Sequence, residues 1–555
     1  MKYRLFLGLL LVLFSVISAE EITLDLLFTN DIHGGIDRYP ATFMNPDFPP
    51  MIGGGGSAAT YIKKARKKSQ QENRDNLLID VGDFFQGHPI GSLSKGKAVM
   101  KYMNMVDYDL TVIGNHEYDI SEEELKETLS LAKFPVLSCN IVKKGTNELV
   151  DYVEPYIVKE IMGVKIGIIG VTTTDTEKMS FPENIKNVDF LPEDESLRKY
   201  IKIINEKENP DLIFVAGHLG LPYNPQPAYD KRYGNNKEKD YKRERYWGLD
   251  AQELAHEVKG IDLIFGGHMH KGFSKPWEDP VTHTLVIQGY AYGSNVGHLI
   301  LKIDKETKSI SGYEFPAIDD GLLITLFEDE FIRDPVIGDS IAAMRKRVES
   351  GFDEVIGEAK KPITKHSKDA QNAIGNLVCE AMLDYAESDF AFINLGGVRD
   401  ELAKGPITYR DVFNVMPFDN QIVTINVSGE FLKDIIEMRV SYGHHGLLLA
   451  GAKVVYNRNR DNYDRVTKLE IGGEPWQKDK IYEVTTSDFL LMGNAGLTML
   501  TKVPEEQIIR YETSLRDVIV DYIKENSPID IGIDDRWRRD DSSKLSENLS
   551  KQQKK

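Results

Sequence analysis

Five short stretches of the sequence each place a side chain that can bind a metal ion directly after a run of apolar residues. They read NDIH, GDFFQGH, GNHEYD, GH and GGHMH, and their metal-capable residues are Asp31, His33, Asp83, Asn115, His116, His218, His268 and His270. The chain has only 12 histidines among 555 residues, so their recurrence in these places indicates one shared site. Imidazole and carboxylate groups without a thiolate favour a borderline ion such as Mn, Zn or Fe. One stretch alone would be weak, because a lone Gly-His after a strand is more often a capping or solvent-facing histidine.

Two such ions would suit the hydrolysis of phosphate esters. Cations about 3.5–4 Å apart can hold both the attacking oxygen and the phosphoryl oxygens of an in-line displacement. Water activated by such an ion loses a proton near neutral pH, so no side-chain nucleophile is needed. His116 could then stabilise charge on the phosphoryl or leaving-group oxygen, and Asp119, three residues later, could orient it and keep it protonated. The alternative for Asp119 is a turn residue before the helix cap at Ser121.

The apolar runs that precede these stretches are short and rich in β-branched residues, and therefore predict buried strands. They cover residues 22–29, 76–81, 109–113, 211–217 and 261–266. Helix-like segments lie between them, one of which begins with Ser121 and Glu124 at the spacing of a capping box. Strands that alternate with helices favour parallel pairing in an α/β core, where ligands bind beyond the carboxyl ends of the strands. The stretch 154–171 is more typical of an antiparallel hairpin.

The chain is too long for one hydrophobic core, and we expect at least two domains. Apolar residues at helical spacing within 337–348 predict an amphipathic helix between them, and we expect the domains to move about this helix. The predicted segments are a signal peptide at 1–19, a catalytic domain at 20–318, a linker with the bridging helix at 319–354, a substrate-binding domain at 355–535 and a disordered tail at 536–555.

The N-terminal residues predict export to the periplasm or the extracellular space. Lys2 and Arg4 precede an apolar run that ends in small residues near Ala19, as in a cleaved signal peptide; the alternative is an uncleaved N-terminal anchor. No later run approaches the length of a membrane span. The formal charge of −19 argues against nucleic acid or an anionic membrane as a partner. Cys139 and Cys379 are too few for a disulfide scaffold, and whether they pair is left open.

In order and spacing, the five stretches resemble the signature blocks of the calcineurin-like metallophosphoesterases. Together with the C-terminal half, they resemble the secreted 5′-nucleotidase/UDP-sugar hydrolase family. The resemblance implies a four-layer β-sandwich flanked by helices, followed by a smaller α/β substrate-binding domain. It also implies hydrolysis of nucleotide phosphate esters by a metal-activated hydroxide, with His116 and Asp119 as a catalytic pair. The implied ligands are Asp31, His33, Asp83 and His270 for one ion, and Asp83, Asn115, His218 and His268 for the other.

The C-terminal half resembles the substrate-binding domain of the same family. The blocks INLGGVRD (393–400) and SDFLLMGNAGL (487–497) carry the resemblance, together with a long stretch around Phe418. By carry-over, Asn394 and Arg399 would contact the substrate, with the guanidinium on phosphate. Phe418 and Phe489 would enclose a flat group such as a base, and the alternative for both is core packing.

Two departures from the family pattern leave nucleoside selectivity open. The family commonly has an aspartate for ribose in the last block, where this chain has Ala495, and Asn494 could replace it only in part. The segment 365–377 lacks the usual arginine and offers only Lys365 and Lys368 as cations. The expected function is hydrolysis of a small-molecule phosphate ester. Two alternatives therefore remain: a sulfate- or thiosulfate-ester hydrolase on the same scaffold, and a non-catalytic binding protein.

A basic, tyrosine-rich insertion at 221–247 lies between two of the metal-capable stretches. It could overhang the site as a flap that attracts anions to an acidic protein. A solvated surface loop is the alternative reading.

Overall fold

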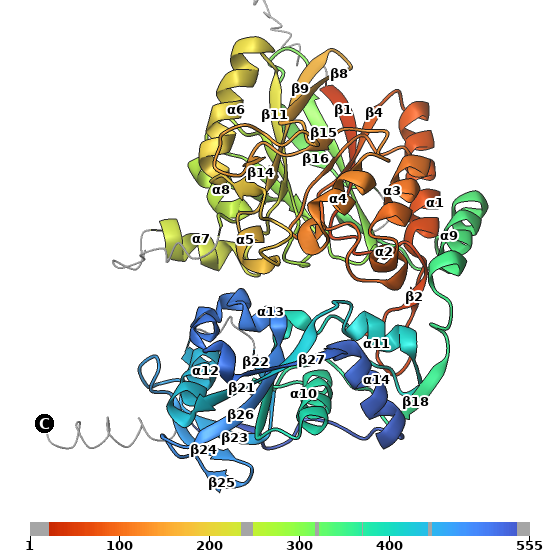
Figure 1. Ribbon diagram of the computed structural model, residues 1–555. Helices are drawn as coiled ribbons and strands as arrows, with labels where there is room; N and C mark the ends of the chain where they lie inside the picture. Colours follow the sequence, from red (N-terminus) through yellow and green to blue (C-terminus); the bar gives the residue numbers. More distant parts are fainter. Residues whose placement is uncertain (1–20, 235–247, 317–320, 369, 442–446, 541–555) are drawn as a thin grey trace, which may run out of the picture.

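The structure is a computed structural model that describes residues 21–234, 248–316, 321–368, 370–441 and 447–540 (Figure 1). The signal peptide predicted at 1–19 lies outside the described residues. Two bodies follow one another along the chain, an upper one in red to green and a lower one in cyan to blue in Figure 1. Among the described residues, no helix combines the length and the apolar character needed to cross a membrane.

The N-terminal body is built on two sheets packed face to face. The first has the strand order β16-β15-β1-β4, with β17 also paired to β15, and the second has the order β13-β14-β12-β11-β9-β8. The strands of the first sheet are β1 (Glu21–Thr29), β4 (Asp75–Asp80), β15 (Asn295–Asp304), β16 (Ile310–Glu314) and β17 (Leu323–Thr325). Those of the second are β8 (Tyr156–Ile161), β9 (Val164–Thr172), β11 (Leu212–His218), β12 (Leu263–Gly266), β13 (Trp277–Glu278) and β14 (Leu285–Gln288).

Strand pairing in these sheets is mixed rather than wholly parallel. Leu26 of β1 pairs in parallel with Leu77 and antiparallel with Leu299. Strands β9, β11, β12 and β14 run parallel, whereas β8 and β9 form the antiparallel hairpin predicted at 154–171. The strand predicted at 109–113 is reduced to β5 (Thr111–Val112), which pairs in parallel with the equally short β6 (Val136–Leu137). Leu110, just before β5, adds one isolated parallel bridge to Ile79 of β4, so the predicted run lies beside the first sheet but forms a full ladder over only two residues.

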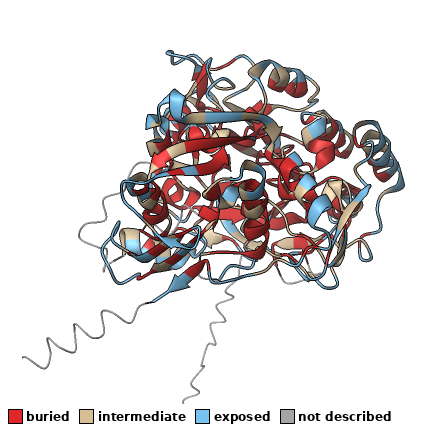
Figure 2. Ribbon diagram, turned by 60° about the horizontal axis from the view of Figure 1, so that its bottom comes forward, coloured by how far each residue is buried: buried red, intermediate tan, exposed pale blue. Residues whose placement is uncertain are grey.

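Helices cover the outer faces of both sheets, and apolar side chains fill the space between them. Leu24, Phe28, Ile168 and Phe265 are among the buried residues of the central core. Helices α1 (Gly54–Gln71) and α3 (Lys97–Val106) contribute to a second core against the first sheet, and α6 (Glu193–Lys207) and α8 (Ala251–Glu257) to a third against the second. Figure 2 shows the buried interior and the exposed outer faces of the covering helices. The predicted four-layer α/β sandwich is therefore confirmed.

The segment predicted as a linker at 319–354 belongs in large part to the N-terminal body. Strand β17 pairs with β15, and Ile324 is fully buried. Helix α9 (Pro335–Val348) forms where the apolar spacing predicts it, but its buried Ile337 and Ile341 join the core beneath α1 and α3. The boundary predicted at residue 318 was therefore wrong, because apolar residues beyond it complete the sheet and its helical cover.

The C-terminal body has a five-stranded sheet in the order β22-β19-β26-β21-β27 and a smaller one in the order β25-β24-β23-β28. The strands of the larger sheet are β19 (Phe390–Asn394), β21 (Gln421–Ser428), β22 (Leu447–Ala450), β26 (Ile481–Ser487) and β27 (Ile508–Ser514). Those of the smaller sheet are β23 (Ala452–Tyr456), β24 (Val466–Ile471), β25 (Glu474–Pro475) and β28 (Trp537–Arg539). The helices are α10 (Ala373–Ala386), α11 (Tyr409–Val415), α12 (Gly429–Ser441) and α14 (Leu515–Asn526). One apolar core joins these elements.

The first residues of the segment predicted at 536–555 as a disordered tail pack on the C-terminal body. Trp537 is 2% exposed, and its strand β28 pairs in parallel with β23. Arg536 is also buried, so this polar stretch contains two large side chains that are buried in the C-terminal body. Residues 541–555 lie outside the described chain. Cys139 and Cys379 are both buried and free, so they do not pair with each other.

Candidate metal centre

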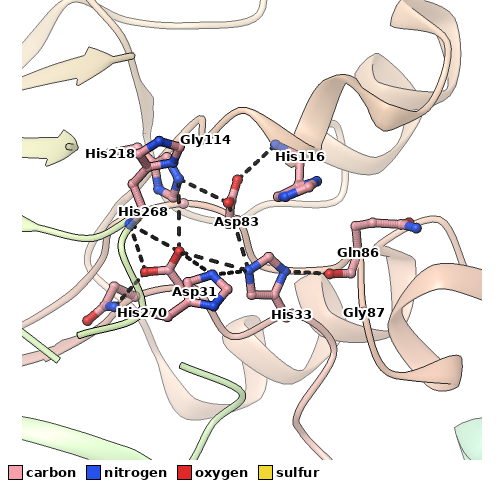
Figure 3. A network of polar contacts seen from close by, with 12 residues as sticks. Asp31, His33, Asp83, Gln86, Gly87, Gly114, His116, His218, His268 and His270 are labelled. Carbon is pink, nitrogen blue, oxygen red and sulfur yellow. Dashed lines mark hydrogen bonds and ion pairs between the residues drawn. The ribbon is translucent and has the colours of Figure 1, made fainter. Parts of the chain in front are cut away.

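The metal-capable residues predicted from the sequence converge at one end of the two sheets (Figure 3). Two groups of side chains each bring their ligand atoms within 4.8 Å of one another, and both groups include Asp83. The first group is Asp31, His33, Asp83 and His270, and the second is Asp83, His218 and His268. They come from the loops that follow β1, β4 and β12 and from the last residue of β11. The sequence therefore identified side chains that are far apart along the chain, from residue 31 to residue 270, but lie together in space.

The nitrogen and oxygen atoms of this centre lie close together and point toward one another. His33 Nε2 lies 2.9 Å from His270 Nε2, and His270 Nε2 lies 3.3 Å from Asp31 Oδ1. His218 donates from Nδ1 to the Val81 carbonyl at 2.8 Å, which leaves Nε2 as its lone-pair nitrogen. A cation is the partner that such a set of inward-facing lone pairs requires.

Two of the buried atoms in the centre have no hydrogen-bond partner within the part of the chain that the structure describes. His218 Nε2 lies 3.0 Å from Asp83 Oδ2 but makes no hydrogen bond with it. Asn115 Oδ1 is also buried and unpartnered, and Asn115 itself is 1% exposed. Leaving a buried polar atom unsatisfied costs about 1–3 kcal/mol. The residues present therefore fit a pair of bound divalent ions, with Asn115 as a further ligand of the second group.

The backbone around the centre adopts a conformation that few residues other than glycine adopt. Five of the seven candidate ligands have φ values in the left-handed region, namely Asp31 (49°), His33 (48°), Asp83 (53°), His268 (70°) and His270 (52°). Such residues are uncommon, and they concentrate at functional sites where the surroundings hold them in place.

Two polar side chains that the sequence analysis missed hold the loops of the centre. Glu117 is fully buried and accepts backbone N–H bonds from Asp83 at 2.9 Å, Phe84 at 2.9 Å and Gly114 at 2.6 Å. Asn30 donates to Asp31 Oδ2 at 2.6 Å and to the Tyr290 carbonyl at 2.7 Å. Both stand inside the quoted stretches, and the signal available was their position beside candidate ligands. Second-layer groups of this kind orient metal ligands.

The electrostatics of the centre favour neutral imidazoles beside a positive charge. Burial lowers the pKa of His33 well below its usual range and that of His268 to about 3, so both rings are neutral and able to bind a metal. Burial also opposes protonation of His218, but the Asp83 and Asp31 carboxylates outweigh it and raise its pKa to about 10. Positive charge is thus favoured between the two aspartates.

His116 lies at the edge of the centre and is oriented by Asp119. The two residues form a short 3₁₀ turn, η1 (His116–Asp119), and His116 Nδ1 hydrogen-bonds to Asp119 Oδ2 at 2.6 Å. The backbone N–H of His116 donates to Asp83 Oδ1 at 2.8 Å. Burial would lower the pKa of His116, but the Asp119 and Asp83 carboxylates outweigh burial and raise it. Helix α4 (Glu122–Leu129) follows with the predicted capping box of Ser121 and Glu124.

A cavity of about 220 Å³ opens beside His116 and is walled by both bodies. The N-terminal body contributes His116, Asp119, Gln86 and Phe181, among others. The C-terminal body contributes the four predicted substrate-binding residues, Asn394, Arg399, Phe418 and Phe489. The structure therefore brings together every catalytic and substrate-binding residue predicted from the sequence, whereas the contribution of Phe181 was not foreseen.

The aromatic rings of this cavity also contact its other walls. The Phe418 ring stacks on His116 with centroids 5.8 Å apart and an interplanar angle of 24°. Phe489 meets Phe181 edge to face at 5.9 Å. Both predicted phenylalanines are half-buried and pack against the C-terminal core, so they serve the core and line the cavity at once. Arg399 NH2 lies 3.3 Å from His33 Nε2, which places its guanidinium at the metal centre.

The residues that depart from the family pattern have specific surroundings. Lys365 donates to the Arg399 carbonyl at 3.3 Å, and burial lowers its pKa to about 8. It lines a second cavity of about 330 Å³, on a wall that Arg399 and His270 also share. Ala495 has a left-handed φ of 52°, and Asn494 is buried with its Nδ2 unpartnered among the described residues.

The described part of the basic insertion packs on a neighbouring helix. Helix α7 (Pro225–Tyr233) lies against α8, where the Tyr233 ring is 3.9 Å from His256 and Arg232 pairs with Asp250 at 2.6 Å. The flap predicted at 221–247 falls in part on residues 235–247, which lie outside the described chain.

Comparison with known proteins gives the same division of the chain. Residues 24–272 match the calcineurin-like phosphoesterase family, and residues 355–502 match the 5′-nucleotidase C-terminal domain. A 5′-nucleotidase of Vibrio parahaemolyticus is 29% identical over 487 residues, which cover 82% of each chain. The crystal structure of a 5′-nucleotidase precursor from Thermus thermophilus superposes with a TM-score of 0.78 at 25% identity, covering 93% of this chain and 99% of that one. The sulfate thiohydrolase SoxB of Thermus thermophilus reaches a TM-score of 0.74 at 17% identity over 93% and 96% of the two chains, and shares the fold.

Proposed function

Because this chain belongs to the family that joins a calcineurin-like phosphoesterase domain to a 5′-nucleotidase C-terminal domain, we propose that it is an exported, metal-dependent hydrolase of nucleotide phosphate esters. The chain is a phosphoesterase-type hydrolase by its family. The observation that carries the finer proposal is the convergence of the candidate ligands beside a cavity lined by His116 and Arg399. Export rests on residues 1–19 of the sequence.

We assign the candidate ligands to two divalent ions that share Asp83. Asp31, His33 and His270 complete one set, and Asn115, His218 and His268 complete the other. When bound, such ions supply Lewis acidity and lower the pKa of water, which is the chemistry that phosphate-ester hydrolysis needs. The donor atoms favour Mn, Zn or Fe.

The protein side chains bind and orient the substrate around this centre. Arg399 presents a forked guanidinium beside His33, where it can donate two parallel hydrogen bonds to phosphoryl oxygens. His116 hydrogen-bonds to Asp119 through Nδ1, so Nε2 is its nitrogen available to donate to the phosphoryl or leaving-group oxygen. The Asp119 and Asp83 carboxylates raise the pKa of His116, which favours retention of that proton.

The flat part of the substrate would lie in the cavity shared by the two bodies. Phe418 and Phe489 line this cavity from the C-terminal body. An aromatic ring can stack on any of the bases, because every base has a π surface. Asn394 Oδ1 is buried and unpartnered at this cavity, so it is an acceptor available to a ligand donor.

Phosphate release from a panel of substrates tests this function. AMP, UDP-glucose, a cyclic nucleotide, an aryl phosphate and an aryl sulfate should be assayed with Mn, before and after chelation. We expect AMP to be hydrolysed and the rate to fall to background on chelation. Sulfate release without phosphate release would favour the sulfate-ester alternative, and chelator-resistant phosphate release would contradict the metal assignment.

A further inference from the structure

Arg516 is a buried cation of the C-terminal body that the proposed chemistry does not use. It stands in the first turn of α14, about 100 positions along the chain from the residues it contacts, and its side chain is 8% exposed. Arginine is almost never buried unless its donors are satisfied, so the partners of Arg516 indicate what it does.

The guanidinium of Arg516 holds four consecutive residues. Nε donates to the Met416 carbonyl at 2.8 Å, and NH2 lies 3.1 Å from the Pro417 carbonyl, 3.0 Å from the Phe418 carbonyl and 2.7 Å from Asp419 Oδ1. Its face covers the Phe413 ring at 4.1 Å. We name residues 416–419 the clamp loop. The clamp loop directly follows the end of α11.

The clamp loop is also where the C-terminal body meets the candidate metal centre. Phe418 stacks on His116, and the Pro417 carbonyl accepts a hydrogen bond from Gln86 Nε2 at 3.2 Å. The Gln86 carbonyl in turn hydrogen-bonds to His33 Nδ1. A continuous set of contacts therefore runs from Arg516 through the clamp loop to two residues of the centre.

We propose that Arg516 is a positioning residue that fixes the Phe418 ring and the Pro417 carbonyl against the N-terminal body. This inference rests on the proposed function, since Phe418 is the wall against which the flat part of the substrate packs. The planar guanidinium reaches these acceptors from two nitrogens, Nε and Nη2, in a fixed geometry, whereas a lysine would present its donors from a single nitrogen on a flexible stem. Arg516 thus determines how well the enzyme selects esters with a flat group.

The test compares Arg516→Lys with Arg536→Lys. Arg536 is an equally buried arginine of the same body that bonds to the Leu449 carbonyl and to Glu380, and it controls for the general loss of a buried guanidinium. Both variants should be assayed with AMP and with glycerol phosphate, which has no flat group. We expect Arg516→Lys to raise the KM for AMP about tenfold, as for the loss of one stacking contact. The KM for glycerol phosphate should rise much less than that for AMP, and the ratio of the two substrates should remain unchanged in Arg536→Lys.

A second measurement needs no turnover. Amide hydrogen exchange in the peptide that covers the clamp loop should become faster in Arg516→Lys and remain unchanged in Arg536→Lys. Equal effects of Arg516→Lys on both substrates, or unchanged exchange of the clamp loop, would overturn the inference. If the unmodified protein fails to hydrolyse AMP, the proposed function fails, and the exchange result still decides whether Arg516 holds the loop.

Discussion

The metal centre and the opposite wall of the cavity are assembled in different ways. In the centre, each candidate ligand stands within a few residues of a strand end, and Asp31, His33 and His218 are fully buried. The cavity wall is made of half-buried groups such as Phe418 and Phe489, carried on loops whose positions depend on distant residues such as Arg516.

This difference indicates that the metal centre determines the chemistry and that the cavity wall determines which substrates are selected. A centre fixed by strand ends and by left-handed backbone tolerates little change, and we expect it to be required for every substrate. A wall on loops can change its side chains without disturbing the centre. Substitutions in the centre should therefore affect every ester, and substitutions in the wall should affect selectivity.

Replacing the shared carboxylate should have the largest effect. Asp83→Asn removes a charge from both ligand sets, and we expect kcat to fall by more than about 10⁴-fold, since each ion supplies several kcal/mol of stabilisation. Asp279→Asn is the matched control, because Asp279 is a fully buried aspartate that bonds to His256 rather than to the centre. Steady-state kinetics with AMP and glycerol phosphate measure both variants. A loss confined to AMP would contradict the assignment.

Removing His116 should slow all esters while the metal content is retained. His116→Ala should reduce kcat by about 10²–10⁴-fold, the usual contribution of a positioned proton donor. His256→Ala controls for loss of a partly buried histidine elsewhere in the N-terminal body. Single-turnover rates and metal analysis should be measured together. Loss of metal from His116→Ala would show that the residue is a ligand rather than a donor.

Shortening the fork of Arg399 should have an intermediate effect. Arg399→Lys keeps the charge but loses the bidentate contact, and we expect kcat/KM to fall about 10- to 100-fold for every phosphate ester, by analogy with the loss of a charged hydrogen bond. Arg66→Lys, whose guanidinium bonds to the Val106 and Asp107 carbonyls, serves as the control. A fall in kcat/KM for AMP alone would indicate that Arg399 contributes to selectivity as part of the cavity wall and does not bind the phosphate.

Trimming the cavity wall should have the smallest effect and the most selective one. Phe489→Leu removes one ring face, and we expect the KM for AMP to rise about five- to tenfold. The values for glycerol phosphate should not change. Phe431→Leu, a half-buried residue of the same core, controls for packing. If both substrates weaken equally, the ring serves only the core, which was the alternative reading of Phe489.

The sequence could indicate which side chains converge because the signals for them are local. A strand that ends in a histidine or an aspartate can be identified from a short stretch of sequence, and parallel strands bring such ends together. The same reasoning located α9 and the capping box at Ser121, where apolar spacing and cap chemistry are also local. It could not place α9 on the N-terminal body, because that depends on the surfaces of α1 and α3.

Residues whose roles depend on distant partners were missed. From the sequence, Glu117 resembles an acidic residue of a solvated loop. In the structure, its carboxylate accepts hydrogen bonds from three backbone N–H groups. Arg516 lies in an ordinary amphipathic helix, and its partners lie about 100 positions earlier in the chain. Trp537 was assigned to a disordered tail because the residues near it are polar. In the structure, its strand β28 pairs with β23, and the Trp537 side chain is buried.

We propose that seven side chains from five stretches form one two-ion centre that shares Asp83. Crystals of the protein grown with Mn and recorded at an anomalous wavelength would show this directly. We expect two anomalous peaks on either side of Asp83, about 3.5–4 Å apart, with a single peak or none in Asp83→Asn. Peaks elsewhere, or a single ion in the unmodified protein that persists in Asp83→Asn, would contradict it.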